Sequence, residues 1–310
     1  MPMPLNDAVM SLRGALTALH PEGRRWLKFL RSFTLAPDAL PRPAPPPGPR
    51  DFIICGAPRT GTTLVSAMLF QPPRVVTVME PWAGMQLPPA PLFASLRDEI
   101  AQTEQLRSGR LDLDALMRSG TVKRVPEGTS MPRVEVEHDY LLGVKWPAFW
   151  QYLELLPDTK FLVCVRHPHE VVASFKRMGG RLGLGLEYDL AFNRRLNQQL
   201  RLATRHLALR RILLYDYING RIIPHLRRPN VYLVRYERWL TEPEALLQEI
   251  GAFLGTVLGS RPARIERPRR EAVLSLAETA MIAEHCHTAA LLGYDSRSAI
   301  PLVQQRIPQT

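Results

Sequence analysis

Short apolar runs alternate along the chain with longer segments in which apolar residues recur at helical spacing. The run Phe161–Val165 is apolar without interruption, which is typical of a strand buried on both faces of a parallel sheet. Other runs predict further strands at Phe52–Cys55, Arg74–Met79 and Asn230–Glu237, and helical segments at Leu92–Leu116 and Leu182–Arg211. This alternation predicts an α/β domain of three layers, with a mostly parallel central sheet flanked by helices.

The pattern changes toward the amino end. Residues 1–40 form a basic amphipathic segment with helical periodicity, and residues 41–50 are rich in proline and cannot continue a helix. No Gly/Ser linker divides residues 51–310, so they are predicted to form one domain. The amphipathic segment is too short and too charged for a signal peptide or a membrane span. Two interpretations stay open: a helix that docks on the core or on a partner, and a helix that lies on a membrane surface.

The segment Asp51–Leu69 has the pattern of a strand, a Gly-rich turn and a helix. Gly56 and Gly61 allow the backbone angles of a tight loop, and the amides of residues 60–63 are predicted to point into it at a helix N-terminus. Such a loop is suited to bind phosphate. The pattern nearly satisfies the G-x-x-x-x-G-K-[ST] signature, but Thr62 stands where a nucleoside triphosphatase has lysine, and Arg59 supplies a cation three residues earlier.

A second anion-binding pattern follows the buried run Phe161–Val165. Arg166 comes directly after this predicted strand, at the edge of the sheet where α/β proteins bind their ligands. Pro168 can begin a helix, so Ser174 is predicted to lie on that helix within reach of the same ligand as Arg166. The guanidinium of an arginine can bind a phosphate through two parallel hydrogen bonds, which makes this segment a second candidate phosphate site.

The two segments together resemble the sulfotransferases that use 3'-phosphoadenosine 5'-phosphosulfate (PAPS), especially the PRSGTT-type branch that includes bacterial and tyrosylprotein sulfotransferases. The loop signature of that branch matches residues 58–63, and its 3'-phosphate signature matches Arg166 and Ser174. The resemblance implies a P-loop-like fold, PAPS as cofactor, adenosine 3',5'-bisphosphate as product and no metal. The cofactor-binding residues that it implies are Pro58, Arg59, Thr60, Gly61, Thr62, Thr63, Arg166, Ser174 and Tyr236.

Three catalytic residues are also implied. Glu80 follows a predicted strand at the same sheet edge as the loop, and in the tyrosylprotein branch a glutamate at nearly this distance from the loop arginine is the base. Arg59 is expected to stabilise charge on the oxygen between sulfur and phosphorus. Lys145 lies in a segment that matches the family's G-x-K-x-P pattern, whose lysine reaches the sulfuryl group in several members. His138 is a rival base ranked below Glu80, because the motif around a histidine base is not evident.

The composition adds a basic bias. The formal net charge is +11, and such a surface attracts an anionic cofactor or an acidic acceptor. No zinc spacing, recognition helix or aromatic stacking motif supports specific nucleic-acid binding. Three cysteines without paired spacing, and no secretory signal, favour a cytoplasmic location. The segment Arg261–Arg270 is rich in arginine and proline and has two interpretations, a lid over the nucleotide and a solvated loop.

The sequence therefore predicts a PAPS-dependent sulfotransferase that acts on a hydroxyl of a small molecule, glycan, lipid, phenol or secondary metabolite. One alternative is a P-loop kinase or NTPase, in which Thr63 would ligate Mg²⁺, although this chain lacks the expected lysine at position 62. The other is a catalytically silent nucleotide-binding scaffold. Departures from the family pattern are Thr60 in place of the loop serine, and His167 and His169 where Asp and Arg are frequent.

Overall fold

The computed structural model of the protein describes residues 46–81, 87–105, 111–112, 123–124, 133–178, 180–187, 190–260 and 274–297. The amphipathic segment predicted for residues 1–40 and the arginine-rich segment Arg261–Arg270 lie outside the described residues, as does half of the proline-rich linker.

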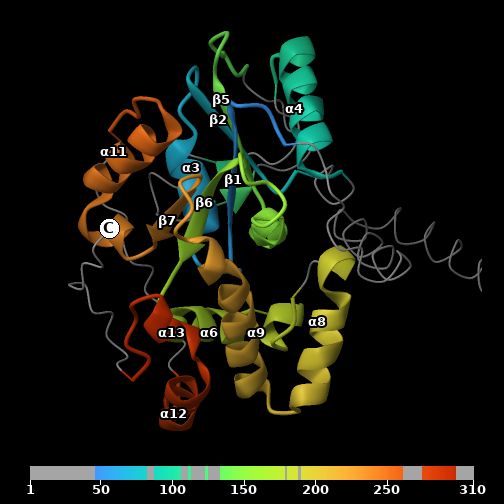
Figure 1. Cartoon of the computed structure of the whole chain (residues 1–310), viewed down its shortest axis with the longest axis vertical. Coiled ribbons are helices and arrows are strands. Elements are labelled where there is room, and N and C mark those ends of the chain that lie inside the picture. Colours follow the sequence, from blue (N-terminus) through green and yellow to red (C-terminus); the bar gives the residue numbers. More distant parts are fainter. Residues whose placement is uncertain are drawn as a thin grey trace, which may run out of the picture.

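A five-stranded sheet forms the centre of the molecule (Figure 1). Its strands are all parallel and lie in the order β2-β5-β1-β6-β7. Their bounds are β1 Asp51–Gly56, β2 Val75–Met79, β5 Leu141–Lys145, β6 Lys160–Val165 and β7 Val231–Arg235. A separate antiparallel pair joins β3 Leu111–Asp112 to β4 Lys123–Arg124. The predicted α/β class and the parallel central sheet are confirmed.

Helices cover both faces of this sheet, so the domain has three layers (Figure 1). Along β1, Phe52 and Ile54 point to one face, where the helices α3 Thr62–Leu69, α10 Arg238–Thr241 and α11 Pro243–Leu254 pack. Ile53 and Cys55 point to the opposite face, because successive side chains of a strand alternate. The elements on that face are α4 Pro89–Thr103, the 3-10 helix η2 Pro147–Tyr152, α6 Pro168–Arg177, α9 Leu207–Ile222 and α12 Leu276–His285.

The remaining elements are short or lie outside the layers. They are α7 Gly180–Gly183, α8 Leu190–Ala203, which has a non-helical residue at Asn193, the 3-10 helix η3 Ile223–His225 and α13 Thr288–Leu291. Figure 1 shows α8 and α9 as neighbouring rods beyond one end of the sheet. The predicted helical segment Leu182–Arg211 is thus divided among three helices. Of the helix predicted over Leu92–Leu116, the part up to Thr103 lies in α4, which ends there because Glu104 adopts a left-handed conformation with φ of 49°. The prediction is wrong at residues 111–112, which form β3.

The strand register brings the carboxyl ends of neighbouring strands to one edge of the sheet. Lys145 at the end of β5 is paired with Met79 at the end of β2 and with Ile54 of β1. On the other side, the end of β6 is paired with the end of β7. Residues that directly follow these strands therefore meet along one edge, where ligands of parallel sheets bind.

Candidate active site

The loop between β1 and α3, which was predicted to bind phosphate, is a tight turn. A Cβ atom at Gly56 would lie 2.3 Å from the carbonyl oxygen of Cys164, so only glycine fits there. The Thr60 hydroxyl donates to the Ala57 carbonyl oxygen at 2.7 Å and closes the turn. The first amides of a helix have no acceptor within it, so those of α3 can bind an anion. Positive φ angles are found at Gly56 (143°), Arg59 (72°) and Gly61 (98°).

Arg59 connects this loop to the second predicted segment. Its Nε donates a hydrogen bond of 3.0 Å to Oγ of Ser174, a residue 115 positions later on α6. The side chain of Arg59 is exposed, whereas Ser174 is buried. Of the other predicted loop residues, Pro58, Thr60 and Thr62 are buried and Thr63 is half-buried in the first turn of α3. The structure therefore brings the two predicted phosphate-binding segments together.

Arg166 follows β6 and is buried, with only 3% of its surface exposed. Three of the other described residues contact it. Its Nη2 forms an ion pair of 2.6 Å with Glu170, in the first turn of α6. Its guanidinium carbon lies 4.0 Å from the ring centre of Tyr236, a cation–π contact. Its carbonyl oxygen accepts a hydrogen bond of 2.9 Å from the Tyr215 hydroxyl. Within the described part of the chain, its buried Nε donates to no acceptor, so this N–H is available to a ligand.

Tyr236 links the two segments on a second side. It follows β7, and its ring lies against Gly61 of the loop, where a Cβ atom would come within 2.5 Å of Cδ2 of the tyrosine. The guanidinium of Arg166 lies over the same ring in a cation–π contact. Gly61 is thus required both by its positive φ and by the close approach of this ring.

Glu80 and Lys145 form an ion pair at the same edge of the sheet. Glu80 comes directly after β2, has a φ of 46°, and donates its backbone N–H to the Lys145 carbonyl oxygen at 2.8 Å. The Lys145 side chain is 3% exposed and that of Glu80 is 19% exposed. The structure thus brings these two predicted catalytic side chains together, with the carboxylate nearer to solvent.

His138, the rival base, lies away from this pair. It is exposed and precedes β5 at its amino end, whereas Lys145 is the last residue of that strand. The two therefore lie at opposite ends of β5, and this geometry does not favour His138 as a base for the site.

The rings of His167 and His169 both contact carbonyl oxygens of the backbone after α13. His167 Nε2 lies 3.1 Å from the Asp295 carbonyl oxygen, and His169 Nε2 lies 2.8 Å from that of Ser296. The backbone N–H of His169 donates to Nδ1 of His167 at 3.3 Å, so His167 caps α6. Burial, with a smaller effect of His169, lowers the pKa of His167 to about 4, so the imidazole is neutral at pH 7. Burial also lowers the pKa of His169.

Three residues around Arg166 were not predicted from the sequence. They are Glu170, Tyr215 and Glu237. The spacing of Glu170, four residues after an arginine at a helix start, is a signal that could have identified the ion pair. Tyr215 and Glu237 are 49 and 70 positions from their partners in this segment, and no local pattern connects them.

Among the described residues, no group of three His, Cys, Asp or Glu side chains is arranged to hold a metal ion. In the same part of the chain, every helix is too short or too polar to cross a membrane.

Comparison with known proteins gives one sequence match and several distant structural likenesses. The model described as "Sulfotransferase family" matches residues 51–258. No curated protein is a significant match for the sequence.

Three solved structures serve as examples of the structural likenesses. A sulfotransferase from Alicyclobacillus acidocaldarius is 17% identical over 80% of this chain and 94% of its own, with a TM-score of 0.43. The sulfotransferase domain from the curacin biosynthetic pathway is 19% identical over 73% of this chain and 78% of its own, with a TM-score of 0.41. A mouse sulfotransferase complexed with PAP is 11% identical over 79% and 88%, with a TM-score of 0.37. These scores are low, so the family assignment rests on the sequence match.

Proposed function

The chain belongs to the sulfotransferase family, and from this premise we propose that it transfers a sulfuryl group from PAPS to a hydroxyl group of an acceptor. The observation that carries the proposal is the hydrogen bond of 3.0 Å between Arg59 and Ser174, which joins the two segments predicted to bind phosphate. PAPS has two anionic arms, a 5'-phosphosulfate and a 3'-phosphate. Two adjoining anion sites suit such a molecule better than one isolated loop does.

The loop residues are proposed to bind the 5'-phosphosulfate. The backbone amides around Gly61 and Thr62 would donate to its oxygens, and the hydroxyl of Thr63 stands in the first helical turn beside them. Pro58 and Thr60 keep the turn in shape, since the Thr60 hydroxyl is occupied by the Ala57 carbonyl oxygen.

Arg166, Ser174 and Tyr236 are proposed to bind the 3'-phosphate side of the cofactor. The buried Nε of Arg166, which donates to no acceptor in the described part of the chain, would donate to a phosphate oxygen. Tyr236 would keep the guanidinium of Arg166 in place through their cation–π contact. The chain would thus distinguish PAPS from nucleotides without a 3'-phosphate.

Catalysis is proposed to use Glu80, Lys145 and Arg59. Glu80 would accept the proton of the acceptor hydroxyl as the acceptor oxygen forms its bond to sulfur. At the same time the bond between sulfur and the bridging phosphate oxygen breaks, and adenosine 3',5'-bisphosphate leaves. Lys145 and Arg59 would stabilise the negative charge that moves onto that oxygen. The acceptor is proposed to be a small molecule, a glycan or a lipid with a free hydroxyl.

Ligand-induced thermal stabilisation tests the cofactor assignment. Adenosine 3',5'-bisphosphate at about 100 times its Kd should add about 2.7 kcal/mol of stability, while ATP with Mg²⁺ should add much less. Arg166→Ala should remove most of the preference for the bisphosphate. Stabilisation by Mg-ATP alone would instead support a phosphoryl-transfer enzyme, and no stabilisation by either would support a silent scaffold.

A second experiment tests the base. Glu80→Gln keeps the size of the side chain and removes its basicity, so turnover should fall by a factor of about 100 or more while the Kd for the bisphosphate stays within about twofold. Glu137→Gln, which changes an exposed carboxylate near the amino end of β5, is the matched control and should leave turnover unchanged. Full turnover by Glu80→Gln would remove the assignment.

A further inference from the structure

The carboxylate of Glu237 joins three separate parts of the chain. Its Oε1 accepts a hydrogen bond of 2.8 Å from the backbone N–H of His167, and its Oε2 accepts one of 2.9 Å from the Tyr294 hydroxyl. Glu237 itself follows β7 and Tyr236. One side chain therefore connects the end of β7, the start of α6 and the segment after α13.

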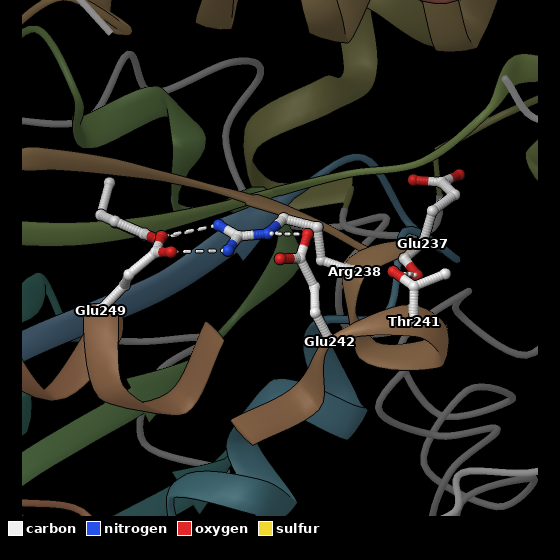
Figure 2. Close-up of polar contacts among 6 residues, drawn as sticks. Glu237, Arg238, Thr241, Glu242 and Glu249 are labelled. Atoms are coloured by element: carbon white, nitrogen blue, oxygen red, sulfur yellow. Dashed lines mark hydrogen bonds and ion pairs between the residues drawn. The ribbon is translucent and has the colours of Figure 1, made fainter. Parts of the chain in front are cut away.

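The residue after Glu237, Arg238, belongs to a separate set of ion pairs (Figure 2). The Arg238 guanidinium is turned toward α11, where it binds Glu249 through two nitrogens, at 2.6 and 2.7 Å, and Glu242 at 2.9 Å. The carboxylate of Glu237 points away from these ion pairs (Figure 2). Arg238 therefore does not compete with His167 and Tyr294 for the Glu237 carboxylate.

The contact with His167 matters because of where that N–H is located. It belongs to the peptide group between Arg166 and His167, whose carbonyl oxygen accepts from the Tyr215 hydroxyl at 2.9 Å. Both polar groups of this one peptide are thus held by side chains, Tyr215 on one side and Glu237 on the other. A peptide plane fixed at both ends fixes the direction in which the preceding side chain leaves the backbone.

The sheet does not hold this peptide. The hydrogen bond from the Tyr236 N–H to the Val165 carbonyl oxygen, at 2.9 Å, comes one residue before the Arg166 carbonyl. Beyond it, a buried backbone N–H needs another partner, and His167 is only 1% exposed. The carboxylate of Glu237 is that partner, at the point where the chain passes from β6 to α6, next to the arginine proposed to bind phosphate.

We propose that Glu237 is a positioning residue that orients Arg166 for the 3'-phosphate by holding the peptide between Arg166 and His167. This inference rests on the proposed function, since it concerns the same cofactor site. In this role Glu237 acts through Arg166 and does not itself touch the ligand. Tyr294 fixes the second oxygen of the carboxylate and so belongs to the same arrangement.

The test is a comparison of two ligands, adenosine 3',5'-bisphosphate and adenosine 5'-phosphate, which differ only in the 3'-phosphate. For Glu237→Ala, the Kd for the bisphosphate should rise about tenfold, whereas the Kd for the monophosphate should change less than twofold. Glu237→Gln should keep nearly all of the affinity, because its amide oxygen can accept from the His167 N–H and its NH₂ group can donate to the Tyr294 oxygen. Tyr294→Phe should weaken the bisphosphate about threefold.

A double-mutant cycle separates positioning from general destabilisation. If Glu237 acts through Arg166, Glu237→Ala should change bisphosphate affinity little when Arg166→Ala is already present. Glu242→Ala is the matched control, since it removes an exposed carboxylate from the Arg238 network and should leave both ligands unaffected. If Glu237→Ala does not fold, the Tyr294→Phe variant carries the same comparison.

The outcomes are distinct. A wild-type protein that binds the two ligands equally would contradict the proposed function. A wild-type protein that prefers the bisphosphate, together with a Glu237→Ala variant that keeps the preference, would overturn only the role of Glu237. Additive effects in the cycle would also overturn it, because they would show that Glu237 does not act through Arg166.

Discussion

The two segments proposed to bind phosphate are built in different ways. The loop of residues 56–61 gets its shape from its own backbone, with three positive φ angles and one hydroxyl that closes the turn. The segment at Arg166 depends on side chains of other elements, Tyr215 from α9, Tyr236 and Glu237 from the end of β7. We therefore expect the loop to be sensitive to added atoms, and the Arg166 segment to be sensitive to lost partners, even distant ones.

The largest effect is expected where the two segments touch, at Gly61. Gly61→Ala adds a Cβ atom 2.5 Å from the Tyr236 ring at a φ of 98°, so overpacking and backbone strain should together destabilise the fold by about 2–5 kcal/mol. Urea unfolding measures the change. Gly180→Ala is the control: its φ is 67°, but none of the described residues has an atom within 4 Å of the new Cβ, so it should cost only about 1 kcal/mol. Equal losses would show that contact with Tyr236 is unimportant.

The two segments should also differ in their response to acid, because only the Arg166 segment contains a group that titrates between pH 7 and pH 4. The pKa of His167 is lowered from 6.5 to about 4, so over this range the unfolded chain binds a proton that the folded chain does not. The free energy of unfolding should therefore fall as the pH drops, by an amount on the order of 3 kcal/mol. The loop has no group that titrates in this range, since Arg59 is its only ionisable residue.

His167→Asn tests this expectation, because asparagine can still cap α6 without titrating. Its free energy of unfolding, measured from pH 7 down to pH 4, should fall less steeply than that of the wild type. A smaller slope should remain from His169, whose pKa is also lowered by burial. Identical slopes in both proteins would contradict a role for His167.

A smaller effect is expected when the Arg166 carbonyl loses its partner. Tyr215→Phe removes one hydroxyl from a fully buried ring and leaves that oxygen without its hydrogen bond, which should cost about 1–2 kcal/mol of stability. Tyr217→Phe changes an exposed ring on the same helix and should have almost no effect. Thermal unfolding of the two variants provides the comparison, and equal losses would argue against this contact.

The smallest effect concerns the charge beside Arg166. Glu170→Gln keeps an oxygen that can accept from Nη2 of Arg166 and removes one negative charge, so the affinity for adenosine 3',5'-bisphosphate should rise about threefold, or about 0.7 kcal/mol. Titration calorimetry at low and high salt should show the gain shrinking as salt screens it. Weaker binding would instead show that the ion pair is needed to orient the arginine.

The sequence predicted the features that depend on neighbouring residues. The strand, glycine turn and helix from Asp51 to Leu69 could be identified because a phosphate loop is a local structure. The helix that begins at Pro168 and carries Ser174 was also correct. The end of α4 was missed, since Glu104 adopts its left-handed conformation without a glycine to signal it.

The sequence could not predict the contacts that connect distant segments. Tyr215 reaches Arg166 only because α9 packs against α6 and the sheet, and no pattern in α9 indicates which of its residues faces that carbonyl. Glu237 follows a tyrosine that was predicted, yet its role depends on β7 lying beside β6. The roles of Glu80 and Lys145 remain predictions, although their ion pair lies at the sheet edge that the sequence predicted for Glu80.

The contacts of His167 and His169 with residues 295 and 296 have a consequence for the synthesis of the protein. These partners are 128 and 127 positions apart in the chain, and Tyr294 lies 57 positions after Glu237. The loop of residues 56–61 follows β1, whose neighbouring strands β5 and β6 are complete at residue 165. The surroundings of Arg166 cannot be complete until residues 294–296 have left the ribosome, so the segment proposed to bind the 3'-phosphate is completed much later than the strands around the loop.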